Sequence, residues 1–104
     1  MQTTVTARHC EISEPLQARA GTIADRLGAL AVRPISCTVL FDVEGTESLA
    51  ELRLLDARGD TLVSRGEGPD HRTALDRAEE RLKRQLETAA GRQRRARRTE
   101  AAEG

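Results

Sequence analysis

Residues 35–56 read ISCTVLFDVEGTESLAELRLLD, and this stretch decides the fold. From Ile35 to Val43, apolar and polar residues alternate except at Leu40, which is the period of a strand with one buried face. The segment EGTE (44–47) then carries a turn signal, and a second alternating run, 50–54, follows it. Two such runs joined by a short turn predict an antiparallel hairpin.

The segments on either side of this hairpin complete the sheet. ARGD (57–60) is a second turn signal and leads into TLVSRGEG (61–68), which predicts the third strand of an antiparallel meander. TTVTA (3–7) is short and rich in β-branched residues, so we expect it to add a fourth strand.

Two amphipathic segments flank the strands. Residues 14–31 repeat apolar side chains at helical spacing after Ser13, and a second repeat follows Asp70; both polar residues are placed to cap a helix. The predicted order is β-α-β-β-β-α, an α+β fold in which a four-stranded sheet carries two helices packed on one face. The apolar positions expected to face the sheet are Leu16, Ala20, Ile23, Leu27 and Leu30, then Leu75, Ala78, Leu82, Leu86 and Ala89.

A chain of 104 residues has room for one domain with a modest core. We expect this domain over residues 1–90 and a basic, disordered C-terminal extension over 91–104, because Gly91 can end the helix and no apolar stripe follows it. No apolar run approaches a membrane span, and the N-terminus lacks a secretory signal. These features predict a cytoplasmic protein whose two cysteines are thiols.

The net charge is zero, but the charge is unevenly distributed. Residues 1–70 carry −4, residues 71–98 carry +6 and residues 99–104 carry −2. A basic segment of this kind indicates a polyanionic partner. Phe41 is the only aromatic residue, so stacking on bases is excluded as the main mode of contact, and charge and shape must dominate.

Arginines of the last helix gather on one stripe at about 100° per residue. The basic stripe consists of Arg77, Arg81, Arg84, Arg92 and Arg95. The opposite, acidic flank consists of Asp76, Glu80 and Glu87. A helix with this separation can lie along a phosphate backbone, and Arg19 and Arg26 of the first helix would extend its basic surface if they face the same way. The alternative is a solvated helix face with arginines paired to nearby glutamates.

Three stretches resemble segments of the ribosome hibernation promoting factor family, also called the ribosome-associated inhibitor family. They are TARHCEISEPL (6–16), EGPDHRTALD (67–76) and RLKRQL (81–86), and the resemblance covers residues 2–90. It implies the same fold and binding to the small ribosomal subunit between head and body, in competition with mRNA and tRNA. Translation would be inhibited by occlusion under stress or in stationary phase, with no catalysis, cofactor or small-molecule substrate.

The family's polar or basic positions match Arg8, Arg81, Lys83 and Arg84, which the resemblance assigns to rRNA contact. With the residues from the charge pattern, the expected rRNA-binding set is Arg8, Arg19, Arg26, Arg77, Arg81, Lys83, Arg84, Arg92, Arg94 and Arg95. Arg72 departs from the family, which has an aromatic residue there, and TAA (88–90) replaces a basic-histidine-basic cluster. Long members carry an additional domain that pairs ribosomes, and we expect this chain to be a short form.

Two other functions fit parts of the pattern. A double-stranded RNA-binding domain has the order α-β-β-β-α, but it places lysines where this chain reads PDHRTALD (69–76). A protein-interaction module could dock a basic partner on the acidic flank. We expect no enzyme and no metal site, because the histidines and cysteines lack the spacing of metal ligands or of a nucleophile with its base. These residues are His9, Cys10, Cys37 and His71.

Overall fold

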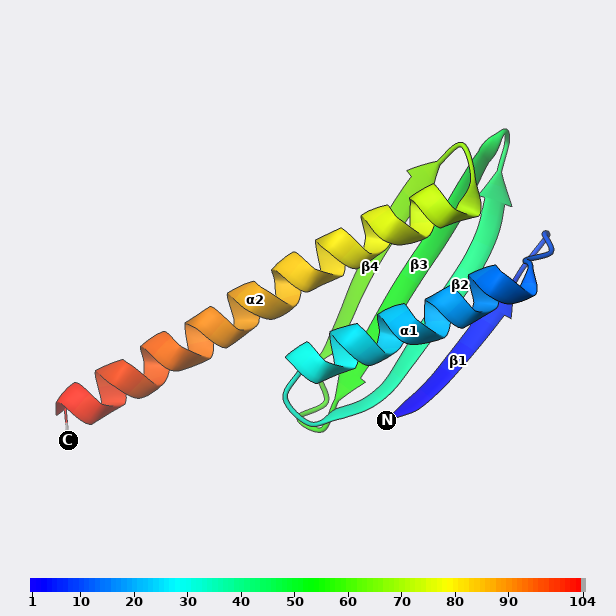
Figure 1. Ribbon diagram of the computed structural model, residues 1–104. Coiled ribbons are helices and arrows are strands. Elements are labelled where there is room, and N and C mark those ends of the chain that lie inside the picture. Colours follow the sequence, from blue (N-terminus) through cyan, green and yellow to red (C-terminus); the bar gives the residue numbers. More distant parts are fainter. Residues whose placement is uncertain (104) are drawn as a thin grey trace.

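A computed structural model describes the backbone of residues 1–103 and the side chains of residues 1–89. Its elements follow the predicted order β-α-β-β-β-α (Figure 1). They are β1 (Gln2–Ala7), α1 (Glu14–Leu30), β2 (Pro34–Glu44), β3 (Glu47–Asp56), β4 (Thr61–Gly68) and α2 (His71–Glu103).

The sheet has the strand order β1-β2-β3-β4, so the predicted meander and fourth strand are confirmed. β1 pairs with β2 in parallel, because α1 carries the chain back to the end of the sheet from which β1 starts. The other two pairings are antiparallel. Gly45 and Gly59, with φ of 61° and 86°, supply the left-handed backbone that the two tight turns need.

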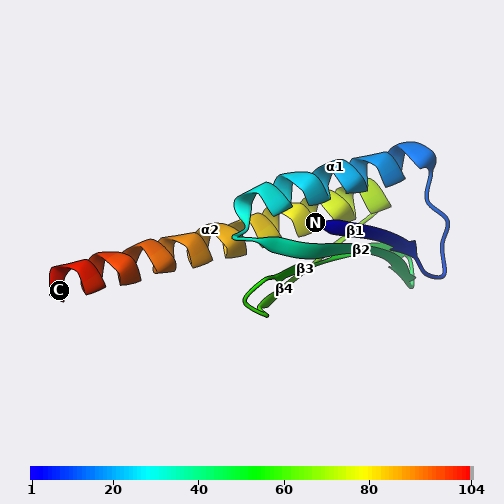
Figure 2. The same cartoon turned by 90° about the horizontal axis from the view of Figure 1, so that it is seen from below.

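Both helices cover the same face of the sheet, as predicted (Figure 2). The two predicted caps are also confirmed. The hydroxyl of Ser13 accepts a hydrogen bond from the N–H of Leu16 at 3.3 Å, and the carboxylate of Asp70 accepts one from the N–H of Thr73 at 2.7 Å. The bond from Thr73 is the main reason why the pKa of Asp70 is lowered.

The core lies between the helices and the sheet, but three apolar residues expected to be buried there are exposed. Leu30, in the last turn of α1, is 44% exposed, and Val43, near the projecting β2–β3 turn, is 37% exposed (Figure 1). Ile35 is 48% exposed, because the register of β2 against β3 shifts between Pro34 and Ser36 and the alternation of faces breaks there. The buried apolar cluster contains Ala20, Ile23, Ala24, Leu27, Cys37, Val39, Phe41, Ala50, Leu52, Leu54, Ala74, Leu75, Ala78, Leu82 and Leu86.

The last helix does not end at Gly91. Where we expected a disordered extension, the backbone of α2 continues as a helix to Glu103, past the end of the sheet (Figure 1). Alanine, arginine, glutamine and glutamate, which dominate this segment, are strong helix formers and outweigh the cost of one glycine. The division of the chain at residue 90 stays a prediction. In the part of the chain that the structure describes, no helix is long and apolar enough to cross a membrane.

α2 lies directly on β4, and small residues allow this close approach. A β-carbon at Gly66 would stand 2.0 Å from the carbonyl oxygen of Ala74, so only glycine fits there. The hydroxyl of Ser64 donates a hydrogen bond to the carbonyl of Ala78 at 2.7 Å. These contacts bring one flank of α2 over the outer edge of the sheet.

Candidate nucleic-acid interface

Three side chains of α2 reach the outer edge of β4 and donate hydrogen bonds to its backbone carbonyls. We call Arg77, Arg81 and Gln85 the edge row. The pairs are Arg77 Nη1 to Glu67 O at 2.6 Å, Arg81 Nη1 to Arg65 O, and Gln85 Nε2 to Val63 O at 2.9 Å. Four residues of helix rise about 6 Å and two residues of strand cover about 6.7 Å, so donors and acceptors stay in register along the edge.

The edge row covers carbonyls that an edge strand otherwise leaves without partners. It also constrains two of the predicted arginines. Arg77 and Arg81 are exposed, and each guanidinium has five N–H donors, so one bond to a carbonyl leaves the others available. Both arginines therefore keep their charge at the surface while the strand fixes their direction.

Arg84 lies on the same flank of α2 but touches no strand carbonyl among the described residues. Its Nη2 donates to Oε1 of Glu80, one turn earlier, at 2.7 Å. Both side chains are largely exposed, at 72% and 65%, and such a pair stabilises a helix by about 0.3–0.5 kcal/mol. A phosphate can therefore replace Glu80 as the partner of Arg84 at little cost.

Arg19 and Arg26 do not extend this flank, because they lie in the seam between α1 and α2. Arg19 donates from Nε and Nη2 to Oδ1 of Asp76 at 3.1 and 2.7 Å. Nη2 of Arg26 lies 2.9 Å from Oε2 of Glu79. Within residues 1–89, Arg19 and Arg26 thus form no common basic surface with the outer flank of α2, because carboxylates of α2 pair with both arginines. Their contact with rRNA stays a prediction.

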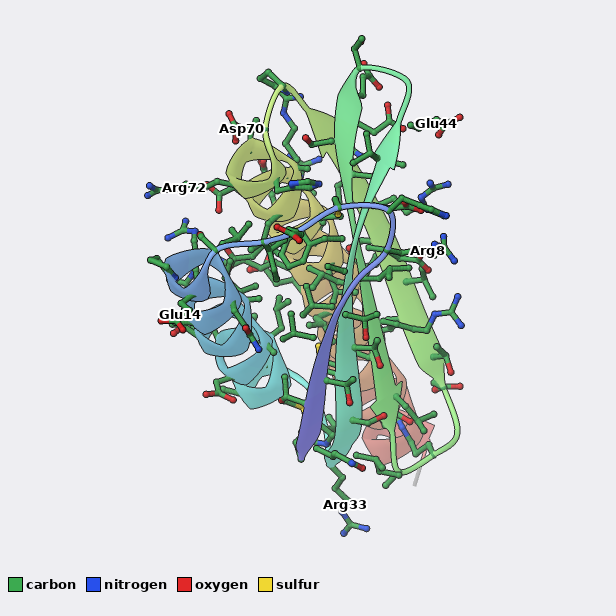
Figure 3. All side chains as sticks on the ribbon, turned by 90° about the vertical axis from the view of Figure 1, so that its right-hand side faces the viewer. Arg8, Glu14, Arg33, Glu44, Asp70 and Arg72 are labelled. Atoms are coloured by element: carbon green, nitrogen blue, oxygen red, sulfur yellow. The ribbon has the colours of Figure 1, made fainter. Side chains whose placement is uncertain are left out.

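The remaining predicted residues are dispersed. Lys83 lines a groove of about 470 Å³ between the helices, together with Arg26 and the carboxylates of Asp76, Glu79 and Glu80. Arg8 lies on the side of the sheet away from the helices (Figure 3). The side chains of Arg92, Arg94 and Arg95 lie outside the described residues. Of the predicted residues whose side chains the structure describes, Arg77, Arg81 and Arg84 are the ones that share one basic surface.

Asp42 of β2 ties the loop after β1 to the sheet. Its carboxylate accepts hydrogen bonds from the N–H of Val43 at 2.8 Å and from Nη2 of Arg8 at 2.8 Å, and Nδ1 of His9 lies 3.1 Å away. These bonds, led by the one from Val43, lower the pKa of Asp42 to about 2. The backbone carbonyl of Asp42 is also 2.9 Å from Nε2 of His71, which links β2 to the start of α2.

The histidines and cysteines considered as metal ligands or nucleophiles make packing and pairing contacts within the fold. His9 pairs with Asp42, and the ring of His71 meets Phe41 edge-on with centroids 5.7 Å apart. Cys37 is fully buried in the core, and burial, assisted by Asp25, raises the pKa of its thiol to about 11. Cys10 is half-buried against the core.

Sequence reasoning missed two residues at the β4 edge. Arg65 is exposed on β4 between buried Ser64 and Gly66, but it belongs to residues 1–70, whose net charge is negative, so the charge pattern does not indicate it. Gln85 carries no charge and therefore lies outside the charge pattern that defines the basic stripe. Its only signal is the spacing of four residues that it shares with Arg77 and Arg81.

The fold and the arginine-lined sheet edge define a small α+β domain of the β-α-β-β-β-α type. The chain belongs to the sigma 54 modulation protein / S30EA ribosomal protein family, whose sequence profile matches residues 3–94. This match confirms the resemblance to the hibernation promoting factor family and makes the chain a member of a ribosome-associated family. No curated protein matches the sequence.

Two solved structures support the fold. A ribosomal subunit interface protein from Coxiella burnetii superposes with a TM-score of 0.76 at 16% identity, over 88% of this chain and 99% of that one. The N-terminal domain of Protein Y from Thermus thermophilus superposes with a TM-score of 0.69 at 24% identity, over 83% of this chain and 96% of that one.

Proposed function

We propose that this protein binds the small ribosomal subunit in the channel between head and body and inhibits translation by occluding mRNA and tRNA. It acts in the cytoplasm of bacteria that are stressed or in stationary phase, without catalysis or a cofactor. The observation that carries this proposal is membership of the S30EA ribosomal protein family over residues 3–94.

The outer flank of α2 supports contact with rRNA. Arg77, Arg81 and Arg84 present three exposed guanidinium groups within about two turns of helix. Asp76 and Glu79 lie on the other flank, where arginines of α1 balance their charge. Guanidinium groups match phosphate oxygens in geometry and charge, so this flank suits an RNA backbone. With the one aromatic ring, Phe41, fully buried, recognition depends on charge and shape.

The two alternative functions have weaker support. Docking of a basic protein on the acidic flank is disfavoured, because Asp76 already pairs with Arg19, and Glu80 with Arg84. A double-stranded RNA-binding module is disfavoured, because β1 pairs in parallel with β2 and has no counterpart in the α-β-β-β-α order.

A charge-removing triple variant tests the contact surface. Gln85 already donates from a side-chain amide to a β4 carbonyl, so we expect Arg77→Gln and Arg81→Gln to keep edge contacts while removing charge. With Arg84→Gln added, affinity for the small subunit should fall by about 10- to 100-fold at moderate salt. The urea midpoint should stay close to that of the wild type.

Arg33→Gln is the matched control, because Arg33 lies at the opposite end of the sheet from Asp70 (Figure 3). It removes one charge without touching α2 and should leave affinity unchanged. Wild-type affinity in the triple variant would overturn the assignment of rRNA contact to the α2 flank.

A further inference from the structure

The outer edge of β4 carries a third arginine next to the edge row. Arg65 alternates with the buried residues Ser64 and Gly66, so its side chain projects from the face of the sheet that the helices leave open. Its backbone carbonyl accepts the hydrogen bond from Arg81. The backbone of Arg65 therefore lies at the outer edge of β4, and its side chain lies on the open face of the sheet.

Two carboxylates lie near Arg65 on the open face. Glu51 is its register partner on β3, but Oε1 of Glu51 accepts a hydrogen bond from Arg53 at 3.1 Å. Glu67 is exposed two residues further along β4 and projects from the same face. Within residues 1–89, whose side chains are described, Arg65 makes no ion pair. Its charge is thus available to a partner, with Glu67 as the nearest opposing charge along the strand.

We propose that Arg65, Arg77 and Arg81 form one binding ridge for the sugar-phosphate backbone of RNA, which wraps from the outer flank of α2 around the β4 edge onto the open face. This inference rests on the proposed function and adds Arg65 to its contact surface. Arg81 donates a hydrogen bond to the backbone carbonyl of Arg65, and the guanidinium of Arg65 projects from the open face. The two guanidinium groups therefore lie on either side of the same peptide group of β4. An RNA strand bound there crosses the edge of the sheet.

The carbonyls of β4 act as positioning groups for this ridge. A free arginine side chain loses considerable rotamer entropy when it binds a phosphate. Arg77 and Arg81 have already lost part of that freedom, because each is bonded to a strand carbonyl. Preorganisation of this kind raises affinity by lowering the cost of ordering.

Single charge changes at the edge test the ridge. The dissociation constant for purified small subunits is measured over a series of salt concentrations for the wild type and for Arg65→Gln, Glu67→Gln and Arg33→Gln. Arg65→Gln should weaken binding by about 3- to 10-fold and reduce the slope of log affinity against log salt by about one. Glu67→Gln removes the opposing charge and should tighten binding by about 2-fold. Arg33→Gln should match the wild type.

The possible outcomes separate the ridge from the proposed function. If the wild type binds the subunit and Arg65→Gln behaves like Arg33→Gln, the ridge is wrong and the proposed function stands. If the wild type does not bind the subunit, both the ridge and the proposed function are wrong. If Arg65→Gln weakens binding to the intact subunit but binds protein-free rRNA of the small subunit as tightly as the wild type does, the partner of the edge is an acidic protein surface and the RNA assignment is wrong. Urea midpoints equal to that of the wild type show that the variants are folded and that the affinities can be compared.

Discussion

Gly66 of β4 lies so close to Ala74 of α2 that a β-carbon at position 66 would stand 2.0 Å from the Ala74 carbonyl oxygen. This contact determines the height of α2 above the sheet. At that height Arg77 and Arg81 reach the carbonyls of β4, so a glycine in a strand determines where the basic flank of the helix lies.

Gly66→Ala should therefore be strongly destabilising. The new methyl group also falls 2.7 Å from the backbone nitrogen of Ala78, so α2 has to move off the sheet. We expect the free energy of unfolding in urea to fall by about 3 kcal/mol, as for overpacked cores. Gly21→Ala is the matched control: a β-carbon placed there would meet no atom within 4 Å outside the neighbouring backbone of its own helix, and alanine in α1 should raise the free energy of unfolding by about 0.5–1 kcal/mol. Equal stability of the two variants would contradict the close approach of α2.

Asp42 should make the fold sensitive to acid in a defined range. Its pKa is lowered from 3.8 to about 2, so its charged form stabilises the folded state. This contribution is fully present above about pH 4 and is lost as the pH falls toward 2. The difference in melting temperature between wild type and Asp42→Asn should thus be constant above pH 4 and shrink below it. A difference that stays constant down to pH 2 would show that the carboxylate is not held in its charged form.

The two thiols should differ in reactivity. Cys37 is fully buried and its thiol has a pKa of about 11, so it forms very little thiolate at pH 8. A thiol reagent should modify Cys10 in the native protein and reach Cys37 only when denaturant opens the core. Cys10→Ser should remove the fast phase, whereas Cys37→Ser should retain it. Equal rates for both cysteines in the native protein would contradict the packing of β2.

Local sequence signals predicted most of the fold. The alternation of faces along β2 and β3 follows from the period of a single strand. Ser13 and Asp70 cap helices through hydrogen bonds to residues three positions further on. Strands and caps can therefore be recognised from neighbouring residues alone. The exposure of Ile35 could not be predicted, because it depends on the register of β2 against β3. Gly91 does not end α2 as expected, because one glycine costs only about 1 kcal/mol among strong helix formers.

The placement of the candidate site's residues was predictable only where the period of a single helix determines it. One helical wheel places Arg77, Arg81 and Arg84 together. Pairing of Arg19 with Asp76 joins two helices, and the bonds of the edge row depend on the approach of α2 to β4. Such contacts connect residues far apart in the chain, and the period of one element contains no information about them.

Co-sedimentation of the purified protein with small ribosomal subunits, with and without excess tRNA and mRNA, tests the central claim most directly. We predict one bound protein per subunit, displacement by tRNA and mRNA, and loss of binding as salt rises, because the contact is mainly between arginines and phosphates. Absence of binding at low salt, or binding that tRNA and mRNA leave unchanged, would contradict occlusion of the channel.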